Sequence, residues 1–535
     1  MRDPKAVRHL THWSIAFGLT CLMTGGGVAV SMGGPVFAAT HSARRASGGP
    51  KGTVTMGSDV PPTSIDPAIG NDDASTIFLT VLYDPLYRYV GNHAVPWLAT
   101  SAVPSQGFQT WTIHIRQGVH FQDGHLVTAQ DVVYSWRRLL TLQQGFSSLF
   151  LPYMSASDVS ASGPLTVTVH LRSPFSALPD ILPYMFTLDP AVVKAHPSDH
   201  GETWLSIHGA GSGPYEIKEW QPNNQYVLTY NKNYWKSWSG SHPATIVWKV
   251  MPNLSDRQLA LISGHVNQIN WLNIQTWRAL KASSNVVADY APTAETFGID
   301  INTQAGPTKS LWLRKALAAA FPYRVAVKEI FGGIGTPVGG PVPYDVTDAN
   351  RALKPGKQNL ALARADLTKG RIAKGTTVEY AYVTGLAEEQ ILGEVLASTM
   401  RPLGINIKVV PMTWPTLSTD MAQAKTDPSL TALYFQGFYD SPESFLTPQF
   451  SNQASGWEDG SHLNVPAINR ILSKAAVTAS AARARSLWIG AQAMIMAQQP
   501  AIYVTQVDTL RAYSRGLVWP NSIFGPTSDY YQIHF

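Results

Sequence analysis

Few side chains in this sequence have the types and spacing that a reactive or metal-binding site requires. His196 and His200 are four residues apart, which is the spacing of two metal ligands on one face of a helix. Pro197 and the serine and aspartate after it favour a loop instead, so we expect two solvated histidines and no metal site. Ser212 lies among alternating glycines, but it lacks the G-x-S-x-G frame of an activated serine nucleophile.

Motifs of hydrolytic and nucleotide-binding enzymes are also missing. The sequence contains no H-E-x-x-H pair, and its single cysteine, Cys21, lies in an N-terminal segment that we expect to be removed. The glycines of residues 209–215 have the wrong spacing for a dinucleotide-binding turn, and a strand pattern follows them. We therefore predict no catalytic residue, no cofactor and no enzymatic activity. A secreted hydrolase remains the weakest alternative.

Length and composition indicate a globular protein with more than one lobe. The chain has 535 residues, whereas one compact core rarely exceeds about 300. Charged residues make up 14% of the chain against about 25% in typical domains, which suits an extracellular protein in a variable or acidic medium. The net charge is +5 and the basic residues form no long run, so nucleic-acid binding has no support.

Residues 1–38 have the layout of a secretory signal peptide. Basic side chains precede an apolar run at residues 15–23, and the segment ends at Ala38 in a small-x-Ala cleavage site. A retained membrane anchor is disfavoured because the apolar run is short. A lipid anchor at Cys21 is disfavoured because the residues before it fit a lipobox badly. We expect a protein that is secreted to the periplasm or the outer face of the cytoplasmic membrane, with a flexible linker at residues 39–52.

A strand, turn, strand and helix are predicted over residues 111–140. Apolar residues alternate with polar ones at residues 111–115, the period of a half-buried strand. We expect a short second strand at residues 119–121, because turn signals flank it. Thr128 then opens a helix, with Asp131 placed three residues later as the acid of a capping box.

The second half of the chain alternates strands and helices. A helix at residues 387–403 lies between strands at residues 377–383 and 405–411, which predicts a β-α-β unit. Strands are also expected at residues 297–302 and 501–504, on either side of this region. The pattern predicts an α/β fold.

Several of these segments resemble one family. Phe121-Gln-Asp-Gly124 and the helix start Thr128-Ala-Gln-Asp-Val-Val-Tyr-Ser-Trp136 are similar to the signature of family 5 solute-binding proteins. This family serves peptide-type ABC importers and includes oligopeptide-, dipeptide- and nickel-binding proteins. Residues 209–215 resemble the G-T-G-P-Y turn of the family, and the likeness extends in order over residues 53–535. It implies a two-lobed periplasmic-binding-protein fold of type II, with three subdomains and a Venus-flytrap cleft.

The resemblance also implies a division of the chain. The expected parts are a signal peptide (1–38), a linker (39–52), a lobe 1 core (53–91, 209–300 and 505–535), an additional lobe 1 subdomain (92–208) and lobe 2 (301–504). The implied function is capture of a peptide or peptide-like solute between the lobes by a monomer that delivers it to ABC permease subunits. A non-peptide solute, such as a metal chelate, a sugar or another small molecule, stays open, and so does a sensor role on the same fold.

The implied ligand site departs from the family pattern. Many peptide binders of this family hold the peptide's α-amino group with the aspartate of a W-x-x-D-x-x-x-P motif. The matching stretch begins at Phe435, and Phe438 replaces the aspartate. The resemblance implies seven ligand-binding residues, taken from this stretch, from the loop that borders the family's cleft and from a position where the family often has a cleft tryptophan. They are Asp72, Asp73, Trp414, Phe435, Phe438, Tyr439 and Asp440. The three aspartates are candidate replacements for the missing anchor, and core packing is the alternative for the aromatic residues.

Overall fold

The computed structural model describes residues 49–451, 454, 456–520 and 530–535. The expected signal peptide with Cys21 and most of the expected linker lie outside these residues. Among the described helices, none has the length and apolar character needed to cross a bilayer.

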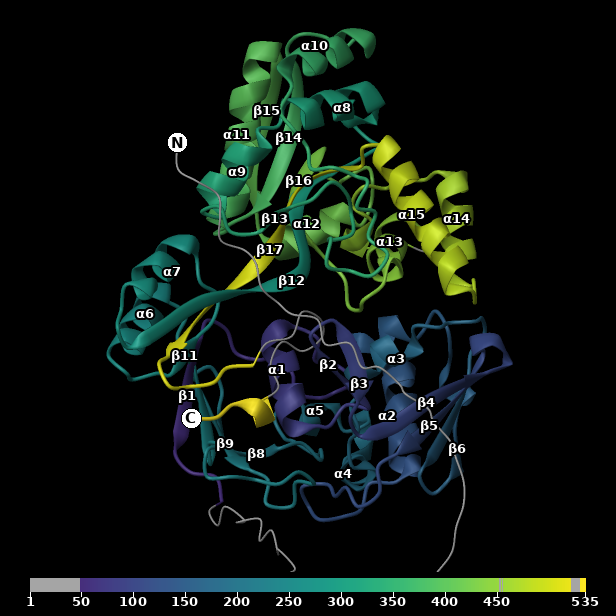
Figure 1. Ribbon diagram of the computed structural model, residues 1–535, viewed down its shortest axis with the longest axis vertical. Coiled ribbons are helices and arrows are strands. Elements are labelled where there is room, and N and C mark those ends of the chain that lie inside the picture. The colour runs from purple at the N-terminus through teal and green to yellow at the C-terminus, as the bar shows by residue number, and fades with distance from the viewer. Residues whose placement is uncertain (1–48, 452–453, 455, 521–529) are drawn as a thin grey trace, which may run out of the picture. The chain divides into compact units, whose positions relative to one another are not determined.

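The largest sheet joins strands from both halves of the chain. Its order is β15-β14-β16-β12-β17-β11-β1-β10-β9-β8, with β13 beside β17. The bounds are β1 (Thr53–Ser58), β8 (Tyr215–Gln221), β9 (Gln225–Tyr230), β10 (Thr245–Val250), β11 (Gln268–Ile269), β12 (Val286–Ile301), β13 (Thr336–Pro337), β14 (Thr376–Val383), β15 (Ile405–Met412), β16 (Leu430–Gln436) and β17 (Ala501–Ser514). The antiparallel pair β12 and β17 runs from one lobe into the other (Figure 1).

Both crossing strands are longer than the sequence pattern predicts. The expected segment at residues 297–302 covers only the last part of β12 and one residue beyond it, and that at residues 501–504 covers only the start of β17. The pairing of the two strands shifts register between Pro292 and Thr296. Because proline cannot donate a ladder hydrogen bond, this irregular stretch hides the continuity of β12 in the sequence.

Lobe 2 is built around the predicted β-α-β unit. The parallel strands β14 and β15 are joined by α11 (Ala387–Met400), and β16 pairs with β14 in parallel. Phe297 of β12, Leu317 and Tyr380 are fully buried together in the core of this lobe. The other helices are α8 (Leu311–Ala320), α9 (Tyr323–Ile330), α10 (Leu360–Lys369), α12 (Trp414–Met421), α13 (Pro442–Phe450), α14 (Pro466–Ala476) and α15 (Ala481–Ala497).

Lobe 1 adds two smaller sheets to its share of the large one. The four-stranded sheet has the order β4-β5-β7-β6, and β2 pairs with β3. These strands are β2 (Tyr87–Val90), β3 (His93–Pro96), β4 (Ala99–Ser105), β5 (Thr110–Ile115), β6 (Val159–Gly163) and β7 (Thr166–His170). The helices are α1 (Asp73–Leu82), α2 (Ala129–Leu142), α3 (Leu178–Ile181), α4 (Pro190–Ala195), α5 (Glu202–Leu205), α6 (Leu254–Ile262) and α7 (Ile274–Lys281).

The start of α2 follows the sequence prediction closely. Thr128 is the N-cap, and its backbone N–H and hydroxyl both donate to Asp131 Oδ2, at 2.8 and 2.7 Å. Trp136 lies on the buried face of the helix. The predicted strand at residues 119–121 is wrong, because only a single bridge between His120 and Leu126 forms there. The turn that follows closes the loop too soon for a longer ladder.

Candidate functional site

The lobes meet at an aromatic contact around the segment that resembles the family motif. The ring of Phe438 lies 6.0 Å from that of Tyr184 and 6.5 Å from that of Phe146, between centroids. The ring of Tyr439 lies 6.3 Å from that of Phe175. The hydroxyl of Tyr184 donates to the backbone carbonyl of Phe438 at 2.7 Å. At the position of the family's aspartate, this chain therefore contacts lobe 1 through an aromatic ring and a backbone oxygen.

Glu443 adds a buried carboxyl to this contact. It lies in the first turn of α13, and its Oε1 accepts a hydrogen bond of 2.6 Å from the hydroxyl of Tyr153 in lobe 1. The ring of Tyr153 stacks on that of Phe175 at 3.8 Å. Burial raises the pKa of Glu443 to about 7, and the bond from Tyr153 opposes this rise. Glu443 was not among the predicted site residues, although it directly follows Pro442, the proline of the motif.

Asp440 is held within its own lobe. Its two carboxylate oxygens accept hydrogen bonds from the backbone N–H and the hydroxyl of Thr347, at 2.6 and 2.8 Å. Its charge still acts across the lobe boundary on Asp180, which follows Pro179 in α3. Burial raises the pKa of Asp180 to about 7, and the nearby Asp440 contributes to the rise. The region between these carboxyls favours positive charge.

Asp72 is also engaged in the fold. It is the N-cap of α1, and its Oδ1 accepts from the backbone N–H of Ser75 at 2.9 Å. Its other oxygen accepts from the hydroxyls of Thr63 and Ser75. A carboxylate with this many donors is already satisfied, and it has little capacity left for a ligand.

Asp73 and Glu295 form an acidic pair that is not engaged in this way. Asp73 is exposed at the start of α1, and Glu295 lies half-buried on the crossing strand β12. Desolvation raises the pKa of Asp73, and the charges of Asp72 and Asp59 raise it further. Burial raises the pKa of Glu295 to about 7, with Asp73 as the second cause. Within the described residues, no hydrogen bond or ion pair to the Glu295 carboxylate is found.

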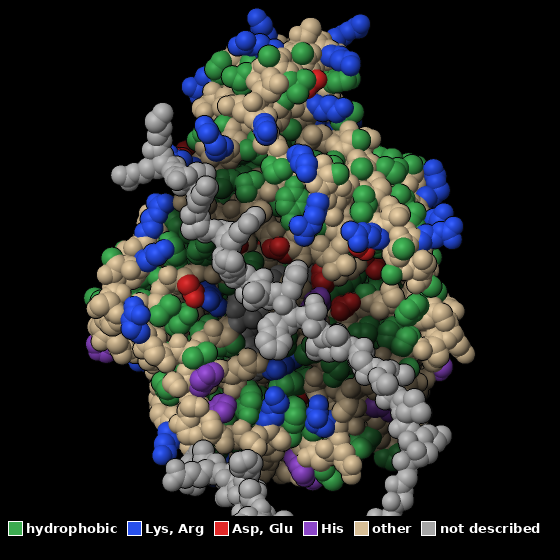
Figure 2. All heavy atoms as spheres, in the orientation of Figure 1, with side chains coloured by type: hydrophobic (Ala, Val, Ile, Leu, Met, Phe, Trp, Pro, Cys, Tyr) green, Lys and Arg blue, Asp and Glu red, His purple; other side chains and the backbone are tan. Residues whose placement is uncertain are grey.

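Acidic side chains are concentrated where the lobes face each other. Most of those visible in Figure 2 gather across the middle of that face, while lysines and arginines are spread more widely. Glu295 could not be selected from the sequence, because it is one of several polar residues in a strand pattern and nothing local distinguishes it from the others. Its proximity to Asp73, more than two hundred residues away in the chain, arises only in the folded protein.

The two other predicted aromatic residues have aromatic partners within lobe 2, although Phe435 on β16 pairs with Thr296, next to Glu295 on β12. Trp414 begins α12, is 39% exposed and contacts the ring of Trp457 at 5.2 Å. Phe435 is buried in lobe 2 and packs against Tyr503, with ring centroids 5.2 Å apart. Phe435 therefore belongs to a hydrophobic core, which was the alternative considered for it.

The two histidines with helical spacing do not share a helix face. His196 ends α4 and stacks on the ring of Trp204, with centroids 5.2 Å apart. His200 follows a short 3-10 turn with its backbone in the left-handed region. The loop that the sequence predicts from Pro197 separates them.

Several known proteins are similar in sequence to this chain. The family model "Bacterial extracellular solute-binding proteins, family 5 Middle" matches residues 93–457. The chain is 25% identical to the probable D,D-dipeptide-binding periplasmic protein DdpA of Escherichia coli K12, over 85% of this chain and 89% of that protein. It is 24% identical to the glutathione-binding protein GsiB of Escherichia coli O6:K15:H31, over 87% and 90%.

Solved structures of similar proteins have the same fold. The periplasmic binding protein DppA from Helicobacter pylori, solved in complex with the peptide STSA, superposes with a TM-score of 0.77 at 19% identity. The superposition covers 91% of this chain and 98% of that one. At this identity the likeness establishes the two-lobed architecture.

Proposed function

The chain belongs to the bacterial extracellular solute-binding proteins of family 5, and on that premise we propose that it captures a peptide or peptide-like solute between its lobes. Delivery of the solute to the permease subunits of an ABC importer completes the proposed role. The relatives named for dipeptide and glutathione binding support this solute class. So does the neighbour of the same fold that was solved with a bound peptide.

The observation that carries the proposal is the carboxylate of Glu295 beside Asp73. Glu295 lies on the strand that crosses between the lobes, where it is half-buried and without a hydrogen-bond partner in the described residues. An ionised carboxylate in such a place is stabilised by a bound cation. The α-ammonium group of a peptide supplies one, so this pair replaces the aspartate that Phe438 displaces.

The other predicted ligand-binding residues are assigned according to the contacts that they already make in the fold. Asp72 and Asp440 are satisfied by bonds within their own lobes, so we assign them to positioning and not to ligand contact. Phe438 and Tyr439 form an apolar wall against lobe 1, suited to a hydrophobic ligand side chain. Trp414 and Phe435 contribute nothing to this proposed site.

Calorimetry on three single variants tests the assignment. Glu295→Gln and Asp73→Asn should weaken binding of a peptide with a free amino terminus, since each removes charge but keeps the side-chain size. A lost charge-assisted hydrogen bond costs about 1.5–3 kcal/mol, or roughly 10- to 150-fold in affinity. Asp440→Asn is the matched control and should bind the peptide as the parent protein does.

An acetylated peptide completes the test. Acetylation removes the ammonium charge, so the parent protein should bind the acetylated peptide weakly, and Glu295→Gln should weaken it no further. Equal losses for the free and acetylated peptides would refute the amine contact. If Asp440→Asn loses affinity and Glu295→Gln does not, the anchor lies at the boundary with Asp180 instead.

We also propose that the protein acts outside the cytoplasmic membrane as a monomer and without catalytic activity. The family's extracellular members support the location. Cleavage after Ala38 is the proposed maturation step. Sequencing the amino terminus of the secreted protein tests it, because a lipid-modified start at Cys21 would replace this assignment.

A further inference from the structure

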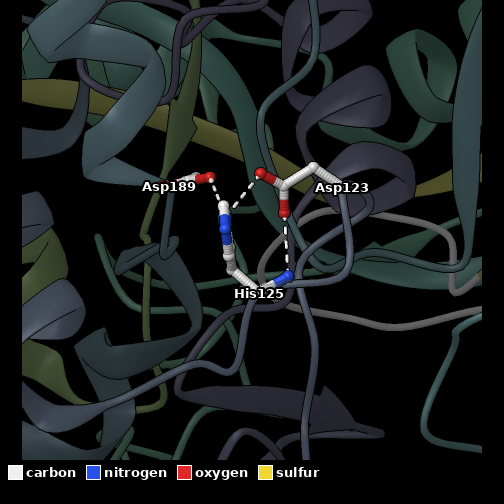
Figure 3. A group of neighbouring side chains, drawn as sticks. All are labelled: Asp123, His125 and Asp189. Carbon is white, nitrogen blue, oxygen red and sulfur yellow. Dashed lines mark hydrogen bonds and ion pairs between the residues drawn. The ribbon is translucent and has the colours of Figure 1, made fainter.

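Three side chains in lobe 1 converge on one point, as Figure 3 shows. Asp123 and His125 lie in the loop between β5 and α2, and Asp189 directly precedes α4. His125 Nδ1 is 2.8 Å from Asp123 Oδ2 and 3.7 Å from Asp189 Oδ2. The three potential ligand atoms all lie within 4.8 Å of one another.

Asp189 has an oxygen that the protein leaves unsatisfied. The residue is only 5% exposed, and its Oδ1 accepts from the backbone N–H of Ala191 at 2.8 Å. Its Oδ2 is buried and has no hydrogen-bond partner in the described structure. His125 Nδ1, at 3.7 Å, is too far away to donate one. A buried carboxylate oxygen without a donor is costly, so this atom calls for a cation.

We propose that Asp123, His125 and Asp189 bind one divalent transition-metal ion, of the class of Zn²⁺, Co²⁺ and Ni²⁺. One imidazole nitrogen with two carboxylate oxygens matches the ligand preference of these ions, whereas Ca²⁺ and Mg²⁺ favour sets made of oxygen alone. Bonds of about 2.0–2.2 Å in a tetrahedron place ligand atoms roughly 3.3 Å apart. The distances of 2.8 and 3.7 Å lie on either side of that value.

The surroundings of the cluster suit an open metal site. The side chains of His125 and Asp123 are 72% and 45% exposed, so water can reach the ion and complete its coordination. Both exposed side chains are free of close packing on their solvent side, so they can adjust to the position of the ion. Asp189 supplies the buried, fixed side of the site.

Backbone hydrogen bonds hold the two ligand-bearing segments in register. The N–H of Gln122 donates to the carbonyl of Gly211 at 2.9 Å, and the N–H of Asp189 donates to the carbonyl of Ala210 at 2.8 Å. Both segments are therefore fixed to two consecutive residues, Ala210 and Gly211, in the loop before β8. The N–H of His125 also donates to Asp123 Oδ1 at 3.0 Å, which orders the turn between these two ligands. A bound ion would link a loop to a helix start more than sixty residues away.

The test uses full-length mature protein without an affinity tag, titrated with zinc chloride alone in a calorimeter. Binding of one Zn²⁺ per chain is expected, with a higher melting temperature in its presence. Loss of a residue that only hydrogen-bonds to a metal ligand weakens metal binding by roughly 10- to 100-fold. His125→Gln and Asp189→Asn each remove a direct ligand, so each should weaken Zn²⁺ binding by more than this. Asparagine keeps the oxygen that accepts from Ala191, so the Asp189 variant should fold. Circular dichroism verifies this.

His114→Asn is the matched control. His114 is an exposed histidine on β5 in the same sheet region, and it should leave the Zn²⁺ titration unchanged. Replacing Zn²⁺ with Co²⁺ should give visible absorption bands that both ligand variants lose. The proposal is overturned if the parent protein takes up no Zn²⁺, or if His125→Gln and Asp189→Asn bind it as tightly as the parent. Peptide affinity should be the same in all these variants, so the outcome is independent of the cleft.

Discussion

Raising the pH from about 5 to about 8 should destabilise this protein through buried carboxyl groups. Asp84 is fully buried in lobe 1, where it accepts hydrogen bonds of 2.8 and 2.9 Å from Trp97 Nε1 and the hydroxyl of Ser212. Burial nevertheless raises its pKa from 3.8 to about 6. Glu443 lies between the lobes, where burial raises its pKa from 4.5 to about 7.

The sign follows from comparing the two states. Each group holds its proton more tightly in the folded protein than in the unfolded chain. Its contribution is therefore fully present below its unfolded pKa and is lost as the pH rises through its folded pKa. His462 acts in the same direction: burial lowers its pKa, but the nearby acids Asp427 and Asp459, at 3.4 and 3.8 Å from its ring nitrogens, outweigh burial and raise it to about 9.

The magnitude can be worked for the two buried acids. Applying the linkage relation from about pH 5 to about pH 8 gives a loss of roughly 1 kcal/mol for Asp84 and roughly 3 kcal/mol for Glu443. Together they predict that the free energy of unfolding falls by at least about 4 kcal/mol over this range, because Asp180 and Glu295, whose pKa values are also raised to about 7, add losses of the same sign. Urea unfolding followed by tryptophan fluorescence, at constant ionic strength, measures this change.

Glu443→Gln isolates one group. Glutamine keeps an oxygen that can accept from Tyr153 but cannot ionise, so the variant should lose roughly 3 kcal/mol of the pH-dependent change. Glu329→Gln replaces an exposed acid on α9 and should leave the pH profile unaltered. If Glu443→Gln retains the pH dependence of the parent protein, the assignment of this group is wrong.

Two further predictions concern the lobes themselves. Arg138→Leu should cost about 3–5 kcal/mol in urea unfolding, because it leaves the buried Asp66 without the guanidinium that binds both its oxygens at 2.6 and 2.5 Å; a loss below about 1 kcal/mol would contradict this. Tyr184→Phe removes the hydrogen bond to the Phe438 carbonyl and should weaken solute binding about 2- to 12-fold, while the unfolding of lobe 2 stays unchanged. Calorimetry measures the affinity for the solute, and small-angle scattering measures how far the protein closes when the solute is bound. An unchanged affinity would show that this hydrogen bond does not favour closure.

Local patterns made much of the fold predictable. The helix after Thr128, with Asp131 in its capping box, depends on neighbouring residues alone, and its start was predicted correctly. The unit of β14, α11 and β15 is equally regular in sequence. The prediction of a short strand at residues 119–121 was wrong, because apolar residues between two turns can also form a loop that is closed by a single β-bridge.

The acidic region could be predicted only in part. Asp73 was found through a motif in the sequence, but Glu295 approaches it from β12 through tertiary folding alone. Asp72 and Asp440 were predicted to contact the ligand, but in the folded protein their carboxylates already accept hydrogen bonds from neighbouring groups, which the sequence does not reveal. Residue type is visible in a sequence, whereas which partners a side chain already has depends on the folded structure.

Native mass spectrometry of the purified protein, before and after adding a library of short peptides, tests the central claim most directly. We predict an added mass that corresponds to a peptide or peptide-like molecule with a basic group, and a reduced amount of that complex in Glu295→Gln. A co-purified sugar or metal chelate that no peptide displaces would contradict the account, as would the absence of any peptide complex at saturating library concentration.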